Sequence, residues 1–266
     1  RKPQKGQQLF PFTPPMLGSS IPTNITTGNA MRVVTLILLV LVCGARGQVL
    51  MHQDFEAGVP GTSRSGWQHT WGQKDDDLLI ISNVQAASGE QALLLNRAHN
   101  TAQWGAQKSL PAIDKGWLFL SVAFRVEGKG DRAHFGVELR NGNKRALALS
   151  FRFGRVSVAT KLPAIPTERA GGGLGLFAED RWYRVCLWLP SRALPKADGR
   201  ARLERRTGDG WAAVGQDVRV ACDLARKASP LAMLCLSPGR TGFRLYLDDL
   251  LCEKKSSPTS RTTKTE

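Results

Sequence analysis

Apolar and polar residues alternate along much of this chain. Between residues 133 and 140, for example, Phe135, Val137 and Leu139 stand at every second position, with polar or small residues between them. The same two-residue period runs through segments 117–127, 145–153, 155–160 and 181–189. Because successive side chains of a strand point to opposite faces, this period predicts β-strands that each bury one face.

Turn-forming residues separate these segments. Asn141-Gly142-Asn143 indicates a hairpin turn between two of them, and Gly208-Asp209-Gly210 marks another turn. We expect the glycine-rich segment 170–175 to be a loop. About a dozen short strands joined by such turns predict an all-β fold, an antiparallel two-sheet β-sandwich or jelly roll. No linker interrupts residues 48–253, which are therefore predicted to form one domain.

The segment 31–47 has the layout of a secretory signal peptide. Met31-Arg32 precedes about ten apolar residues, and Ala45 and Gly47 stand where a cleavage site needs small residues. The apolar run is too short to span a bilayer, so we expect an exported protein, secreted, periplasmic or at the cell surface, with no stable transmembrane segment after cleavage. Lipid attachment at Cys43 is an alternative. Residues 1–30 are expected to be a non-native or disordered extension, and 254–266 a disordered tail.

The net charge is +15. Residues 1–47 carry five bases and no acid, so the remainder keeps 32 bases and 22 acids, a net charge of +10. A basic surface favours an acidic polysaccharide, an anionic cell surface or nucleic acid. No compact Lys/Arg run with interleaved aromatic residues occurs, so nucleic acid is not expected.

Four cysteines follow the predicted signal peptide. An even number in an exported protein suggests up to two disulfides, and the sequence does not choose among the pairings. The candidates are Cys186, Cys222, Cys235 and Cys252. A metal site is the weaker interpretation, because no C-x-x-C spacing occurs.

Several short motifs together resemble a known family. They are D-F-E-A-G at 54–58, G-W at 66–67, S-G-E-Q-A-L-L-L at 88–95, D-R-W-Y-R-V at 180–185 and F-R-L-Y-L-D-D-L-L at 243–251. Their order is similar to that in concanavalin A-like lectin/glucanase (laminin-G-like) sandwiches and related jelly-roll carbohydrate-binding modules. This fold carries lectins, enzymes and structural modules, so the resemblance implies the fold more than the function.

In many modules of this type a Ca²⁺ ion clips the first and last strands together. The resemblance therefore implies a structural calcium site at Glu56 and Asp248 or Asp249, which would supply carboxylate oxygens. The alternative is that these acids bond to turn amides or nearby arginines.

A carbohydrate or another cell-surface polymer is the expected partner. Aromatic rings stack on sugar rings, and charged groups bond to the hydroxyls. On strand parity we expect the ligand-binding residues on one exposed, concave sheet and its rim to be Trp67, Trp71, Trp117, Arg125, His134, Glu138, Arg140, Arg152 and Trp188. The alternative is that the tryptophans belong to the core, as we expect for Trp182.

No motif identifies a reaction. The paired-carboxylate pattern of glycosidases of this fold is missing, and Gly136 stands where the corresponding lyase strand would carry its first arginine. The first hypothesis is therefore a non-catalytic exported binding module. The alternatives are a divergent glycoside hydrolase or polysaccharide lyase, and a structural or adhesive envelope protein.

Overall fold

The computed structural model describes residues 47–61, 66–72, 79–97, 104–111, 113–128, 134–142, 144–159, 171–191, 193–194, 197–208, 210–220, 231–237 and 242–258. All of them belong to the compact unit Arg46–Glu266. The expected signal peptide and the residues before it lie outside the described residues. No helix occurs in the ranges above, and no helix long and apolar enough to cross a membrane is found among them.

The strands form two antiparallel sheets. The nine-stranded sheet has the order β13 (Gly210–Ala213), β12 (Gly199–Thr207), β11 (Trp182–Pro190), β6 (Trp117–Gly128), β16 (Phe243–Lys255), β4 (Ala92–Arg97) and β3 (Leu79–Ser82), with β1 (Gln48–Gln53) paired to β16 and β14 (Val218–Val220) paired to β12. The seven-stranded sheet has the order β10 (Gly171–Leu176), β9 (Arg155–Ala159), β8 (Lys144–Arg152), β7 (His134–Asn141), β15 (Leu231–Ser237), β5 (Trp104–Leu110) and β2 (Trp67–Gly72).

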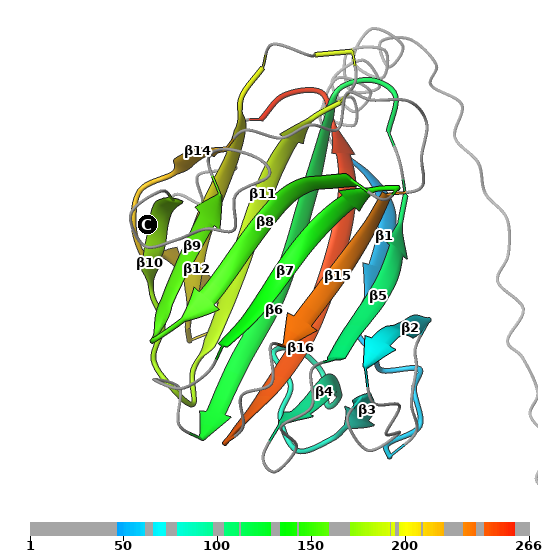
Figure 1. Ribbon diagram of the computed structural model, residues 1–266, viewed down its shortest axis with the longest axis vertical. Helices are drawn as coiled ribbons and strands as arrows, with labels where there is room; N and C mark the ends of the chain where they lie inside the picture. Colours follow the sequence, from blue (N-terminus) through cyan, green and yellow to red (C-terminus); the bar gives the residue numbers. More distant parts are fainter. Residues whose placement is uncertain are drawn as a thin grey trace, which may run out of the picture. The chain divides into compact units, whose positions relative to one another are not determined.

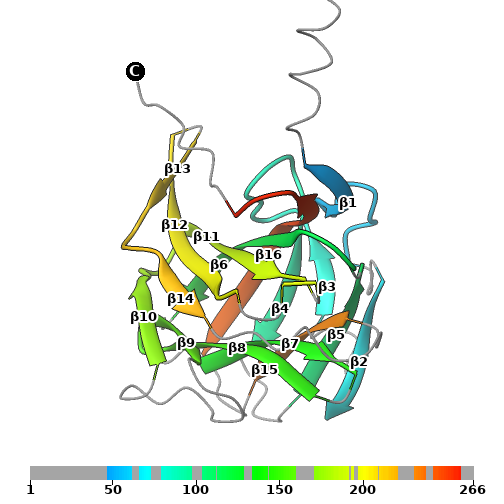
Figure 2. The ribbon, with the colours of Figure 1, turned by 90° about the horizontal axis from the view of Figure 1, so that it is seen from above.

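The two sheets pack face to face. The seven-stranded sheet is turned to the viewer in Figure 1, and the view from above shows the sheets as two layers (Figure 2). One buried apolar cluster draws alternate side chains from both sheets, including Leu120 of β6 and Leu149 of β8. The prediction of an all-β, antiparallel two-sheet sandwich is confirmed.

Aromatic residues join the sheets at the centre of this core. The ring of Phe124 on β6 lies 5.0 Å from the ring of Phe151 on β8 and 6.2 Å from that of Phe135 on β7. Phe135 and Phe151 stack on each other at 4.1 Å. Edge-on and stacked contacts of this kind add to the free energy gained by burying the apolar area.

Strand β16 changes its neighbour halfway along. It pairs with β6 along its length, whereas on its other edge Phe243–Leu247 pairs with β4 and the segment from Leu250 onward pairs with β1. A β-bulge between Asp248 and Leu251 marks the change, and Asp249 there has a φ of 46°. The bulge shifts the alternation by one residue, so that Leu247 and Leu250 both face the core.

Two boundaries differ from the prediction. Residues 171–175 of the glycine-rich segment expected to be a loop belong to β10, because strand pairing needs only backbone groups and Leu174 is buried in the core. The expected tail begins inside β16, where Lys254 and Lys255 pair with β6 and the Lys255 ammonium lies 4.2 Å from the ring centre of Phe119. That cation–π contact holds the end of the strand on the sheet.

Phe124 is expected to be the most sensitive core position. Phe124→Ala should lower the free energy of unfolding in urea by about 3–5 kcal/mol, because it opens a cavity between the two sheets. Phe153→Ala is the matched control, since that ring is 54% exposed and should change stability by less than about 1 kcal/mol. Equal effects of the two substitutions would contradict this account of the core.

Candidate functional site

The structure divides the expected ligand-binding residues between the two sheets. Trp117, Trp188 and Arg125 lie on β6 and β11 of the nine-stranded sheet, whereas Glu138, Arg140 and Arg152 lie on β7 and β8 of the seven-stranded sheet. His134 lies on β7, with its side chain outside the described residues. The expectation of one shared face is therefore wrong, because alternation fixes which face of a strand a residue occupies but not which sheet the strand joins.

The tryptophans are buried. Trp67 faces the main core from β2 and is 1% exposed, so it does not rim a binding surface. Trp117 and Trp188 lie on the outer face of the nine-stranded sheet, as parity predicted, but they pack with Phe119 and Cys186 under Leu194 and Ala197. Neither ring is available for stacking on a ligand in this arrangement. The side chain of Trp71 lies outside the described residues.

Trp182 is buried as expected, but on the outer face of the nine-stranded sheet rather than between the sheets. It packs with Ala87 and Tyr246. Its neighbour Tyr183 is the one that enters the main core, and the Tyr183 hydroxyl accepts a hydrogen bond from the Ala178 N–H at 2.9 Å.

The outer face of the seven-stranded sheet carries a cluster of fixed charges, the Glu138 cluster (Glu138, Arg140 and Arg145). Arg140 donates to Glu138 Oε2 from Nε at 3.0 Å and from Nη2 at 2.9 Å. Arg145 Nη2 lies 2.5 Å from Glu138 Oε1. Both carboxylate oxygens of the buried Glu138 thus bind arginines, which holds the two guanidinium groups in place.

Arg145 was missed by the sequence analysis. Strict alternation along β8 does not place it beside Arg140. The register shift between Leu139 and Arg140 brings Arg145 opposite Arg140, and Glu138 then bridges them. A bulge of this kind leaves no signal in the alternation itself.

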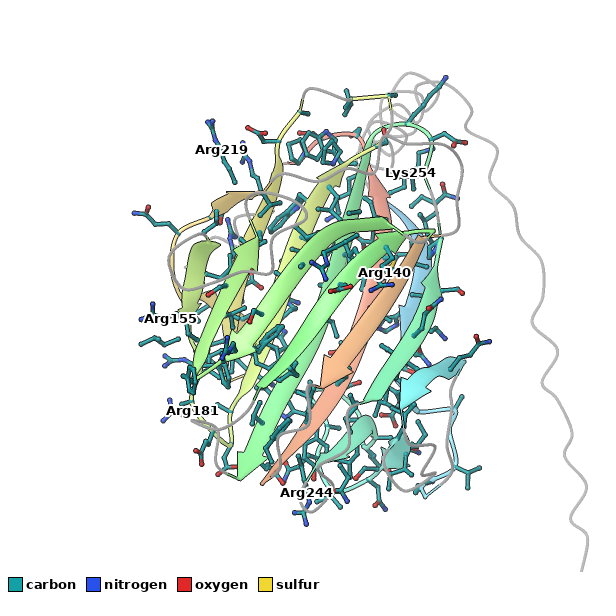
Figure 3. The ribbon with its side chains drawn as sticks, viewed as in Figure 1. Arg140, Arg155, Arg181, Arg219, Arg244 and Lys254 are labelled. Atoms are coloured by element: carbon teal, nitrogen blue, oxygen red, sulfur yellow. The ribbon has the colours of Figure 1, made fainter. Side chains whose placement is uncertain are left out.

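A second pair of arginines lies at the other end of this face, the Arg152/Arg155 pair. The two residues stand opposite each other across the β8–β9 hairpin, and His134 stands opposite Arg152 on β7. Figure 3 shows Arg155 on the left of the sheet and Arg140 on its right. No carboxylate lies within ion-pairing distance of either Arg152 or Arg155 among the described residues, and Arg152 Nε is buried with no hydrogen-bond partner.

Short side chains separate the two groups of arginines. Gly136 and Ser157 flank Ser150 in the strand register, and Ala148 lies opposite Glu138. From Glu138 to His134, opposite Arg152, the strand covers about 13 Å at the usual rise per residue. Ala148 and Ser150 are buried, whereas Gly136, Ser157 and the four arginines keep some exposed surface that an extended molecule could contact.

Three arginines on the opposite, nine-stranded face are paired with acids. Glu204 lies 2.5 Å from Arg184 Nη2 and 3.7 Å from Arg202 Nη1, and Arg202 also pairs with Asp217. Arg125 pairs with Glu127 at 3.2 Å and with Asp180 at 3.7 Å. Arg200 and Arg219, which stand opposite each other on β12 and β14 of the same sheet, have no carboxylate within ion-pairing distance among the described residues.

The acids expected to hold calcium bind backbone amides instead. Glu56 Oε1 accepts hydrogen bonds from the N–H groups of Glu90 and Gln91 at 2.9 and 2.8 Å. Gly89 allows this approach, since a Cβ there would collide with Glu56 Oε1. Asp248 Oδ2 accepts from Ala87 N–H at 2.7 Å and Ser88 N–H at 3.1 Å, and Oδ1 accepts from Asp249 N–H.

These contacts do not fit a calcium site. Asp249 Oδ1 accepts a hydrogen bond from the Ser88 hydroxyl at 2.7 Å, so the acids serve the turn between β3 and β4. No group of three or more His, Cys, Asp or Glu side chains that could hold a metal ion is found in the described ranges. The acids instead fasten the turn to β16 and to the segment after β1.

Burial gives Asp248 an unusual acidity. The side chain is completely buried, and desolvation raises its pKa to about 7, against the lowering effect of the hydrogen bond from Ser88 N–H. Burial likewise raises the pKa of Cys186 and of Cys252 to about 12, so neither thiol is reactive.

The expected disulfides do not include Cys186 or Cys252. Both thiols are free and buried, and they lie on opposite faces of the nine-stranded sheet, Cys186 with Trp188 and Cys252 in the main core. The bulge in β16 turns Cys252 inward. Cys222 and the side chain of Cys235 lie outside the described residues.

Solved structures resemble this arrangement of sheets. An alginate lyase of family PL-14 from Aplysia kurodai has a TM-score of 0.51 and 12% identity, covering 78% of this chain and 99% of that one. Lectin II from Ulex europaeus has a TM-score of 0.50 and 10% identity, covering 78% of this chain and 100% of that one. A carbohydrate esterase from the Shiga toxin-encoding bacteriophage phi24B has a TM-score of 0.51 and 12% identity, covering 79% and 100%.

The chain has the concanavalin A-like lectin/glucanase fold. The resemblance that the motifs indicated is thereby confirmed at the level of the fold, which lectins and carbohydrate-active enzymes share. No family model matches the sequence, and no curated protein matches it.

Asp248 should make stability depend on pH. Below about pH 4 the Asp248 carboxyl is protonated in both the folded and the unfolded state. Between about pH 4 and 7 the folded state keeps a proton that the unfolded state loses. The free energy of unfolding therefore falls as the pH rises through this range. The fall amounts to roughly 4 kcal/mol for a shift of this size. Urea unfolding from pH 4 to 8 should show a shallower fall in Asp248→Asn, which cannot titrate. Parallel profiles would contradict this role.

We expect that calcium does not stabilise the fold, since backbone amides already bind both oxygens of Asp248 and one oxygen of Glu56. The melting temperature should be the same in EDTA and in millimolar calcium. A calcium-dependent rise that is lost in Glu56→Ala would restore the calcium interpretation.

Proposed function

We propose that this chain is an exported, non-catalytic protein that binds carbohydrate on the outer face of its seven-stranded sheet. The observation that carries the proposal is the Glu138 cluster, in which one buried carboxylate holds two arginines in fixed positions. Donors held in place before binding lose little conformational entropy when a ligand arrives. Guanidinium groups of this kind can donate to the hydroxyl, ring or acid oxygens of a sugar.

The neighbouring surface supports the same proposal. Gly136 and Ser157, both half-buried, leave little side-chain bulk between the two groups of arginines. An extended chain of sugar units needs such a low, continuous stretch, with polar groups at its ends.

Binding is favoured over hydrolysis by the carboxylates of this face. Glycosidases of the usual kind need two carboxyl groups on either side of the bond that breaks. Glu138 is the one carboxylate on this face in the described strands, and both of its oxygens are occupied by arginines. It is better placed to position cations than to transfer a proton.

Export is part of the proposal and rests on the sequence. The segment 31–47 has the charge, length and small residues of a signal peptide. The N-terminal sequence of the protein secreted from its host should begin near Gln48. Retention of residues 31–47 in the mature protein would contradict export by this route.

The chain offers a matched pair of variants to test the binding face. Glu138 and Glu204 are both buried glutamates held by two arginines, on opposite outer faces. Glu138→Gln should weaken glycan binding about tenfold or more, because the two arginines lose their shared anchor. Glu204→Gln should cost similar stability and leave binding unchanged.

The measurement is a glycan array on the mature protein, followed by titration calorimetry of each hit with the two variants. Binding to no glycan would contradict the proposal and favour a structural or adhesive role. Release of reducing ends or unsaturated products from a bound polysaccharide would favour an enzyme instead.

A further inference from the structure

The two ends of the proposed binding face are built alike but differ in one component. At one end Arg140 and Arg145 stand opposite each other across β7 and β8, with Glu138 between their guanidinium groups. At the other end Arg152 and Arg155 stand opposite each other across β8 and β9. No carboxylate is found between this second pair in the described part of the chain.

An unneutralised pair of this kind costs free energy. Like charges directly opposite on neighbouring strands repel each other. Arg152 Nε is in addition a buried donor with no acceptor, which carries the cost of its lost hydration. The Arg152 guanidinium lies 5.3 Å from the ring centre of Phe153, which positions the group without neutralising it.

The net charge of the whole face also favours an anionic ligand. The described strand residues of this face include four arginines (Arg140, Arg145, Arg152 and Arg155) and one acid, Glu138, which gives a net charge of +3. On the opposite face Arg125, Arg184 and Arg202 each have a carboxylate within 4 Å, whereas Arg200 and Arg219 have none among the described residues.

We infer that the ligand is an anionic polysaccharide and that one of its carboxylate or sulfate groups binds the Arg152/Arg155 pair, as Glu138 binds Arg140 and Arg145. This inference rests on the proposed function and names its ligand class. The acid group supplies the missing charge, relieves the repulsion of the pair and accepts from guanidinium donors. The row of short side chains leads from this group towards the Glu138 cluster.

Two matched pairs of polysaccharides test the inference. Polygalacturonate is compared with its fully methyl-esterified form, and dextran sulfate with dextran, so that each pair shares one backbone and differs in charge. Binding should be confined to a charged member, and its affinity should fall steeply with added salt. Polyglutamate serves as a charged chain without sugar, and equal binding to it would overturn the inference.

Two variants locate the acid-binding group. Arg152→Ala should weaken binding to the charged polysaccharide about tenfold, the loss expected for one charge-assisted contact. Arg219→Ala removes one exposed arginine from β14 in the other sheet and should change the affinity little. Equal losses in both variants would mean that net charge alone attracts the polymer, and would overturn the inference.

Ser150→Glu tests the same point from the opposite direction. Ser150 precedes Arg152 by two positions on β8, as Glu138 precedes Arg140 by two on β7, so the new carboxylate should occupy the place of the ligand's acid. This variant should lose binding to the charged polysaccharide while its melting temperature is kept or raised. Unchanged binding would overturn the inference.

The outcomes separate the two proposals. If the protein binds a neutral and a charged member of a pair equally well, and Glu138→Gln weakens both, carbohydrate binding stands and the anionic class fails. If it binds none of the four polysaccharides and no array glycan, both proposals fail.

Discussion

The pairing of β16 with β6 is the constraint on which the larger sheet depends. β16 lies near the end of the described chain, yet it stands inside the sheet, with β6 on one edge and β4 and β1 on the other. Closing so long a loop costs conformational entropy, which the buried faces of both strands have to offset. β4 and β1 cannot join until β16 is in place. The bulge at Asp248 is where one neighbour ends and the next begins, so it controls how the first strands attach.

Polar groups buried at that bulge explain why it has an acid at its centre. The change of partner strand leaves backbone N–H groups of the β3–β4 turn and of Asp249 in need of acceptors. Asp248 accepts from three of them, and Glu56 accepts from two more at the far end of the same turn. Arg206 donates from β12 to the carbonyl oxygen of Ala87 in this turn. The motifs around Glu56 and Asp248 that indicated the fold are therefore explained by amide bonding without a bound cation.

The sequence predicted the strands well and their assembly poorly. Segments 117–127, 145–153 and 181–189 match β6, β8 and β11 to within a residue or so, because alternation is a local property. It does not reveal that β6 and β7, adjacent in the chain, join different sheets, and so Trp188 and Glu138 were placed on one face. Alternation also gave the wrong result at two β-bulges, one of which brings Arg145 beside Arg140 while the other turns Cys252 inward. The burial of Trp67 depends on the distant strands that cover it, which no short pattern encodes.

The pairing of charges on the two outer faces bears on where a ligand binds. An arginine that is already paired with an acid gains little from a ligand's acid group, because the existing ion pair would first have to break. On the nine-stranded face Glu204 and Asp217 hold Arg184 and Arg202, whereas Arg200 and Arg219, opposite each other on β12 and β14, have no carboxylate within ion-pairing distance among the described residues. On the seven-stranded face the one described carboxylate, that of Glu138, pairs with Arg140 and Arg145. The Arg152/Arg155 pair therefore has no acid to neutralise it among the described residues. A fold that serves lectins and enzymes alike does not choose between its faces. The seven-stranded face is favoured because Gly136 and Ser157 leave little side-chain bulk between the Glu138 cluster and the Arg152/Arg155 pair, so that one extended anionic chain can reach both.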